Sequence, residues 1–257
     1  MQRKITASLL GGVVAIWSIA AAHAQTVLEQ AMEHRYQLDL HVPDAALQKM
    51  LPAGWQPDVA SSGAAKDANI RLIFIDRIDI SDADGKPLGK GSNQVAMFEV
   101  PVKSTSGSEK GRMIIAGLSK DASAAPGLFG VFHAATKARM TRSIEMSGGA
   151  TIVTEDWSFA GSGGEHMQVH VKFERGAGPV RTEDTPFFDP SAPAKHWIVR
   201  NTHETDITRN AIVHPPDRVK EFSYQAGGGR IAALFDGTQK VISWDSQPSY
   251  NLTVLAP

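Results

Sequence analysis

The chain of 257 residues contains no cysteine. Disulfide bonds, cysteine-based zinc sites, iron–sulfur clusters and thiol nucleophiles are therefore excluded together, because each needs a cysteine sulfur. Any covalent chemistry of this protein must use lysine, serine, threonine, histidine or a carboxylate. Stability must come from a packed core, which a chain of this length can form.

The sequence also lacks an excess of either charge, with 26 basic and 27 acidic side chains. Nucleic-acid-binding proteins usually carry a basic surface, so we expect no nucleic-acid partner. Neither the phosphate-binding loop of NTPases nor the dinucleotide fingerprint Gly-x-Gly-x-x-Gly occurs in the chain. We therefore expect no nucleotide-dependent reaction and predict no cofactor.

A single long apolar run occurs, at the N-terminus. Arg3 and Lys4 precede it, and residues 22–24 form a small-x-small cleavage site. This pattern is typical of a secretory signal peptide, which predicts cleavage after Ala24 and a periplasmic or secreted protein. An uncleaved anchor is the less favoured alternative, because the run is rich in Ala, Gly and Ser and only about 18 residues long. We expect residues 25–257 to form one β-rich domain without stable membrane insertion.

Short runs rich in β-branched and aromatic residues alternate with Gly, Ser and Asp turns along this domain. The pattern predicts a mainly β fold, an antiparallel β-barrel-like cone or sandwich. Prolines bracket a short helix over residues 43–51. A substantial internal helix is predicted over residues 126–146, where apolar residues recur at helical spacing. Residues 176–195, rich in Pro and Gly, are predicted to form a long loop, and residues 230–235 a strand.

Two motifs resemble metal sites, but their spacing argues against both. His166 and His170 would share one face of a helix, yet the alternating residues around them predict a strand, where they lie about 13 Å apart. The aspartates around Gly85 match a calcium-binding loop at neither its first nor its twelfth position. A solvated hairpin turn is the simpler interpretation, and we predict no metal site.

Lys137, Arg139 and Arg142 form a basic stripe on the predicted internal helix, next to the apolar Phe132. The simpler interpretation is a solvated helix face above a core-facing one. In the functional interpretation, a lysine partly buried in an apolar barrel near other cations has a depressed pKa and forms a Schiff base with a carbonyl substrate. Lys137 is the best-placed candidate for such an amine.

Three short motifs follow one another near the start of the predicted domain. They are YQLDL at residues 36–40, VPDAAL at 42–47 and LPAGWQP at 51–57. In this order they resemble the N-terminal part of the acetoacetate decarboxylase-like superfamily. The resemblance implies a barrel-like cone with a mostly apolar internal cavity and, in decarboxylase members, a Schiff-base lysine in a tandem Lys-Lys motif after a glycine. Here Lys137 stands alone after Gly130, and Arg139 is the neighbouring cation, so decarboxylation does not follow from the resemblance.

The leading hypothesis is an exported barrel protein that binds or transforms a small carbonyl or carboxylate compound, with Lys137 as a Schiff-base amine. Arg139 and Arg142 would attract the anionic group, and Glu145 or Glu155 would carry protons. The remaining predicted ligand-binding residues are Phe132, His133 and Trp55. One alternative is a non-catalytic periplasmic binder of an apolar molecule. Another is an envelope interaction protein that uses an exposed sheet edge. A homo-oligomer is compatible with each of the three.

Overall fold

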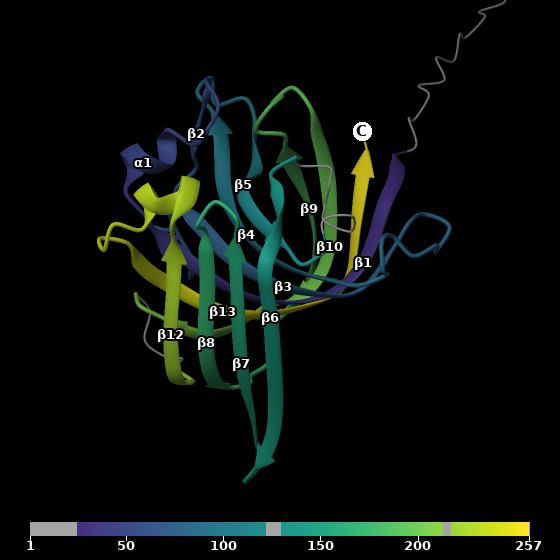
Figure 1. Cartoon of the computed structure of the whole chain (residues 1–257), viewed down its shortest axis with the longest axis vertical. Coiled ribbons are helices and arrows are strands. Elements are labelled where there is room, and N and C mark those ends of the chain that lie inside the picture. Colours follow the sequence, from purple (N-terminus) through teal and green to yellow (C-terminus); the bar gives the residue numbers. More distant parts are fainter. Residues whose placement is uncertain (1–24, 122–129, 213–216, 257) are drawn as a thin grey trace, which may run out of the picture.

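The computed structural model describes residues 25–121, 130–212 and 217–256, and strands dominate it (Figure 1). Within these ranges thirteen strands form one continuous hydrogen-bonded sheet. The prediction of a mainly β, barrel-like protein is confirmed. In chain order the elements are β1 (Thr26–His41), α1 (Asp44–Gln48), β2 (Trp55–Pro57), β3 (Ile70–Ser81), β4 (Asn93–Ser104), β5 (Lys110–Ser119), β6 (Phe132–Ser147), β7 (Ala150–Gly161), β8 (His166–Glu174), β9 (Val180–Phe188), β10 (His196–Glu204), β11 (Asp206–Asn210), β12 (Val219–Gly227), η3 (Gly229–Leu234) and β13 (Lys240–Ala256).

Seven of these strands close into a barrel. Each is hydrogen-bonded to the next in the order β5, β9, β10, β13, β1, β3 and β4, and β4 pairs with β5 again. The seam between β5 and β9 is short and parallel, and Arg112 lies opposite Phe187 there. The C-terminal end of β5 joins the two layers, because Gly117 to Ser119 pair with β4 on one edge and with the start of β6 on the other.

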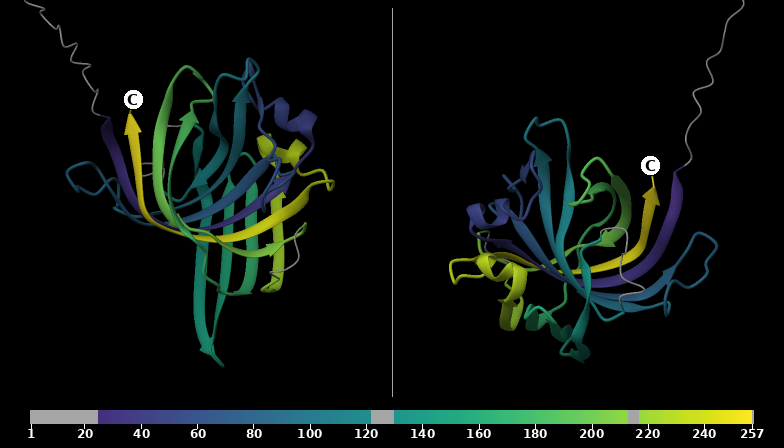
Figure 2. Two further views of the ribbon diagram at one scale, coloured as in Figure 1. Left: turned by 180° about the vertical axis from the view of Figure 1, so that it is seen from behind. Right: turned by 45° about the horizontal axis from the view of Figure 1, so that its top comes forward.

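The strands β6, β7, β8 and β12 form an antiparallel sheet, the covering sheet, which packs on one side of the barrel (Figure 2). The larger apolar core lies between the two layers. Tyr36 of the barrel packs against Phe173 of the covering sheet, with ring centroids 5.8 Å apart, and Phe74 packs against Trp157 at 5.9 Å. Successive side chains of a strand point to opposite faces. Alternate residues of each barrel strand therefore point into the lumen, and the residues between them point outward, either into this core or to the solvent.

The predicted internal helix over residues 126–146 is wrong in its described part, because that segment forms β6. β6 pairs with β7 from Ala135 to Ser147. Its Ala, Lys, Arg and Met residues favour a helix by only about 0.5 kcal/mol each, and continuous pairing with a neighbouring strand outweighs that preference. Residues 122–129 lie outside the described ranges.

Two other expectations are corrected. The predicted loop over residues 176–195 contains β9, a barrel strand, and residues 230–235 belong mainly to the 3₁₀ helix η3 rather than to a strand. Glycines with positive φ at 227–229 turn the chain out of β12 and into η3. The short helix between the prolines is confirmed as α1. Among the described residues, no helix combines the length and apolar composition needed to cross a membrane.

Candidate functional site

The lumen of the barrel is polar at one end, and β1 shows how the sequence produces it. Tyr36 and Leu38 point to the core between the layers, whereas the alternate residues Arg35, Gln37 and Asp39 line the lumen. All five side chains are buried. A strand that is buried on both faces normally consists of a continuous apolar run. The alternation in β1 therefore indicates that its lumen face is buried but hydrophilic.

The polar end of the lumen contains a cavity of about 420 Å³. This volume lies within the range of about 300–1,000 Å³ that is usual for small-molecule sites. The apolar end is filled by a second, smaller core, and the space left there is about 40 Å³. The side chains that give the cavity its chemistry come from six of the seven barrel strands: Arg35, Gln37, Asp39, Arg71, Arg112, Arg181, Glu183, Asn201, His203, Asp245 and Gln247.

Arginine and carboxylate side chains form a network along the cavity wall. Nε of Arg71 donates to Asp39 at 2.6 Å, and Nη1 of Arg112 donates to Glu99 at 2.8 Å. Arg35 donates through two nitrogens to Glu33, at 2.9 and 2.7 Å. Each guanidinium carries five N–H donors, so these contacts leave donors available for a further acceptor.

The far end of the lumen is closed by a buried ion cluster. Arg77 is 1% exposed and contacts both Glu29 and Glu33. Burial alone would raise the pKa of Glu33, but the charges of Arg35 and Arg77 outweigh it and hold the pKa below its ordinary value. This cluster seals the lumen and holds Arg35 at the inner end of the cavity.

Two buried polar atoms in this region have no hydrogen-bond partner among the described residues, Nδ1 of His203 and Oε2 of Glu99. His203 lines the cavity directly. Burial lowers the pKa of His203, and the charges of Arg35 and Arg112 add to this effect against the opposing charge of Glu183 and a backbone hydrogen bond with Asn201.

Asp245 is a deeply buried carboxyl group on the cavity wall. It is 3% exposed, and it accepts hydrogen bonds from Ser243 at 2.9 Å and Gln37 at 3.4 Å. Burial, together with the negative charge of Asp39, raises the pKa of Asp245 to about 7. A group with that pKa can donate or accept a proton near neutral pH.

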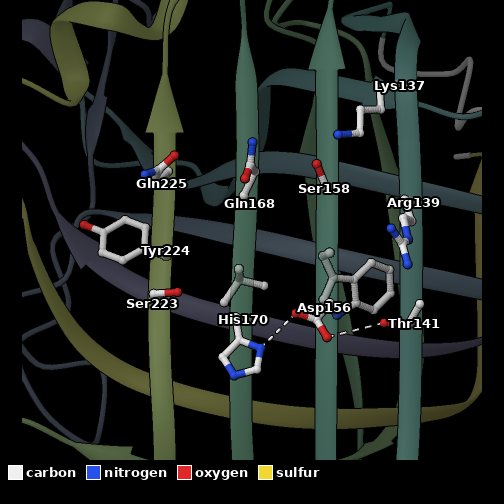
Figure 3. Close-up of a pocket in the computed structure, with 12 residues that line it drawn as sticks. Lys137, Arg139, Thr141, Asp156, Ser158, Gln168, His170, Ser223, Tyr224 and Gln225 are labelled. Atoms are coloured by element: carbon white, nitrogen blue, oxygen red, sulfur yellow. Dashed lines mark hydrogen bonds and ion pairs between the residues drawn. The ribbon is translucent and has the colours of Figure 1, made fainter.

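A second hollow lies on the outer face of the covering sheet (Figure 3). Its volume is about 560 Å³, and Lys137 and Arg139 from β6 border it. Asp156 contacts Nδ1 of His170 at 2.8 Å, which raises the pKa of His170 above its ordinary value. Because Lys137, Arg139 and Asp156 are exposed, water and salt screen the charges of this hollow far more than those of the lumen.

The structure distributes the predicted site residues over several places. Lys137 and Arg139 lie together in the outer hollow, but Lys137 is exposed, so the burial assumed for a Schiff-base lysine is not met. Glu145 and His133 are exposed on β6. None of these residues borders the lumen cavity.

Arg142 and Glu155 are neighbours between the two layers. Nε of Arg142 donates to Glu155 at 3.0 Å, and His34 and Trp157 contact the same carboxylate at 3.0 and 2.8 Å.

The two predicted aromatic ligand-binding residues pack against other protein groups. The ring of Trp55 lies 4.4 Å from that of Phe188. Phe132 lies against Gly117, where an added Cβ would come within 2.4 Å of the ring. Neither residue borders the lumen cavity. The ligand-binding roles of these two residues remain predictions.

Neither a family model nor a curated protein matches the chain. Solved structures do match over nearly its whole length. The enduracididine biosynthesis enzyme MppR, complexed with pyruvate, aligns with a TM-score of 0.55 at 12% identity, over 92% of this chain and 91% of that one. An acetoacetate decarboxylase-like enzyme from Sphingomonas wittichii RW1 aligns at 0.53, with 13% identity over 91% and 92%. The acetoacetate decarboxylase of Legionella pneumophila aligns at 0.50, with 12% identity over 98% and 96%.

The chain has an acetoacetate decarboxylase-like fold. The resemblance inferred from the N-terminal motifs is thereby confirmed for the fold. In this chain, the described residues lining the lumen cavity include four arginines and no lysine. Groups of three or more metal-ligating side chains are also absent from the described part.

The lumen residues of this barrel were not predicted from the sequence, although the sequence carries a signal for them. Glu99 is the single charged residue in the otherwise apolar run at 95–100, and Arg35 and Asp39 alternate with large apolar residues on β1. A charge inside a strand whose other residues are core-forming predicts a paired, enclosed position. Periodicity alone does not predict which distant strand carries the partner of such a buried charge.

Proposed function

We propose that the barrel lumen binds a small carboxylate compound that also carries a carbonyl group. The observation that carries the proposal is that four arginine side chains line one cavity, where the hydrogen bonds of Arg71 and Arg112 leave further N–H donors unused. Guanidinium groups bind carboxylates through two parallel N–H···O bonds, and such charge-assisted bonds are strong where water is excluded. The related fold of MppR, which has been observed with pyruvate, supports the carbonyl part of the proposal.

Arg35 and Arg112 are the proposed anchor for the carboxylate. Both act on the pKa of His203, so the three groups are near one another in the cavity. Arg112 uses only Nη1 in its bond to Glu99. The remaining nitrogens of Arg112 are available to a ligand, and His203 lines the same cavity.

The first prediction concerns Arg112→Gln, tested by isothermal titration calorimetry with pyruvate. Loss of one charge-assisted contact should weaken binding by at least about tenfold. Arg200→Gln is the matched control, because Arg200 lies on β10 but is exposed and pairs with Asp184 away from the cavity. Equal affinities of the two variants, or no pyruvate binding by the unaltered protein, would contradict the proposal. Circular dichroism melting verifies that both variants are folded.

The competing catalytic hypothesis is a decarboxylase-like lyase that forms a Schiff base at Lys137. It would place the reaction in the exposed outer hollow, with Arg139 beside the amine. Borohydride trapping with a panel of β-keto acids, followed by mass spectrometry, tests this version. An adduct on Lys137 that persists in Arg112→Gln would favour the outer hollow, whereas no adduct with any substrate would leave the lumen as the better site.

Binding of an apolar molecule is the non-catalytic alternative. The apolar end of the lumen offers about 40 Å³, close to the space of one water molecule, so an apolar ligand of several carbons does not fit there without repacking. Native mass spectrometry of the purified protein decides this point. A co-purified apolar compound that Arg112→Gln retains would support the alternative.

We also propose that the protein is exported and loses residues 1–24. The basic start, the apolar run and the small-x-small site after it support this proposal. The intact mass of protein recovered from the periplasmic or culture fraction should correspond to a chain that begins at Gln25. A mass that includes Met1 would contradict cleavage.

A further inference from the structure

Asp245 occupies a particular place in the lumen relative to the proposed carboxylate anchor. It lies on β13 directly opposite Gln37 of β1, and Gln247 lies opposite Arg35. Arg35 and Gln37 are two residues apart on one face of β1, which corresponds to about 7 Å along the strand. Asp245 and Arg35 therefore border the same cavity, displaced by two residue positions along the paired strands.

The separation of Arg35 and Asp245 along the cavity wall suits a ligand that carries two oxygen-containing groups. A carboxylate held by Arg35 and Arg112 would leave the rest of a short ligand directed along the wall towards Asp245. In a keto acid the second function is a ketone oxygen, which can only accept hydrogen bonds. A group that recognises it must carry a proton.

We propose that Asp245, in its protonated form, donates a hydrogen bond to the ketone oxygen of a keto acid whose carboxylate is anchored by Arg35 and Arg112. This inference rests on the proposed function and assigns substrate discrimination to one residue of the same cavity. The hydrogen bonds from Ser243 and Gln37 hold the carboxyl group in place. An ionised carboxylate only accepts hydrogen bonds, so it would repel the ketone oxygen that the acid form attracts.

The surroundings of Asp245 favour the acid form up to neutral pH. Burial and the charge of Asp39 raise its pKa to about 7, against the opposing effects of Ser243, Arg71 and Gln37. From β11 the residue opposite it is the uncharged Ile207. The other charged or titratable groups that face the cavity are Arg35 on β1, Arg112 on β5, Arg181 and Glu183 on β9, and His203 on β10.

Keto acid binding should therefore depend on pH. The acid form is present below the pKa and is lost as the pH rises through it, so affinity should be high at pH 6 and fall towards pH 8. For a single group with a pKa near 7 the decrease is about tenfold. His203 does not produce the same change, because burial moves its pKa below the ordinary value and away from this interval.

The experiment compares pyruvate with propionate, which lacks the ketone, by calorimetry at pH 6 and pH 8. In the unaltered protein pyruvate should bind more tightly than propionate at pH 6, and most of this preference should disappear at pH 8. Asp245→Asn always carries an N–H donor, so it should keep the preference at both pH values. Asp184→Asn, exposed on β9, is the matched control and should behave as the unaltered protein.

The outcomes separate the two levels of the proposal. If neither acid binds at any pH, the proposed function fails. If both bind but Asp245→Asn retains the full pH dependence, the role of Asp245 is overturned while the lumen site stands. Should Asp245→Asn fail to fold, calorimetry of the unaltered protein in two buffers of different ionisation enthalpy gives the answer. Pyruvate binding at pH 7.5 should take up part of a proton, and no uptake would overturn the role.

Discussion

Glu155 shows how this fold stabilises a single charge out of contact with water. Its side chain is fully buried between the layers, where His34, Arg142 and Trp157 all contact it. Burial acts to raise the pKa of Glu155, but the hydrogen bond and charge of His34, the charge of Arg142 and the Trp157 bond outweigh it. The pKa in the folded protein is therefore below its ordinary value of 4.5.

Glu155→Gln should destabilise the fold in a pH-dependent way. Because the folded pKa is depressed, the ionised carboxylate stabilises the fold above about pH 4.5, and this contribution is lost as the pH falls below that value. Removing one partner of a buried ion pair costs about 3 kcal/mol, so we expect that loss in the free energy of unfolding at pH 7. Urea denaturation at pH 7 and pH 3.5 measures it, and the difference should shrink at the lower pH.

The control for this prediction is Glu145→Gln. Glu145 lies on the neighbouring strand β6 but is exposed, so its replacement should change the free energy of unfolding by less than about 0.5 kcal/mol. Similar effects of the two substitutions would show that the buried network does not contribute to stability.

β6 illustrates at the element scale why the internal helix was mispredicted. Its apolar residues fit both a helical spacing and a strand with Ala138 and Met140 facing the core. Only the long pairing with β7 distinguishes the strand from the helix. That pairing is a contact with another segment of the chain, so the local pattern of β6 does not contain it. β9 was missed for a related reason: five of its nine residues are exposed, so no apolar pattern marks it as a strand.

The start of β6 depends on a glycine in β5. A Cβ on Gly117 would come within 2.4 Å of the Phe132 ring. Gly117→Ala should therefore lower the free energy of unfolding by about 2 kcal/mol through overpacking. In a Phe132→Ala background the same substitution should cost much less, because the clashing ring is gone. Thermal or urea denaturation of the four proteins measures the coupling, and equal costs in both backgrounds would refute a steric cause.

At the scale of the whole molecule, the short seam between β5 and β9 decides whether the lumen is enclosed. Gly111 sits at this seam, where a Cβ would lie 2.3 Å from the carbonyl oxygen of Pro186 and 2.8 Å from the ring of Phe188. The adjacent residue, Arg112, carries the proposed carboxylate contact. Closure of the barrel and construction of the site therefore depend on the same few residues.

Gly111→Ala should push β9 away from β5 and loosen the barrel locally. We expect faster amide hydrogen exchange in β9 and β10, with β7 and β8 little changed, because the covering sheet does not pair at this seam. Overpacking by one methyl group should cost about 1–3 kcal/mol in the free energy of unfolding. Uniformly faster exchange in all strands would show instead that the seam is not a local closure point.

The chemistry of the residues and the alternation of polar and apolar faces along the strands follow from the sequence alone. The absence of cysteine restricts covalent chemistry, and the period of two along β1 separates polar from apolar side chains. The tertiary structure decided which polar face is enclosed. Arg35, Arg112 and Asp245 come from strands far apart in the chain, and pairing between those strands brings them to one cavity. A local period is the same for a surface-facing and a lumen-facing strand, so only barrel closure distinguishes an exposed lysine on β6 from a buried arginine on β1.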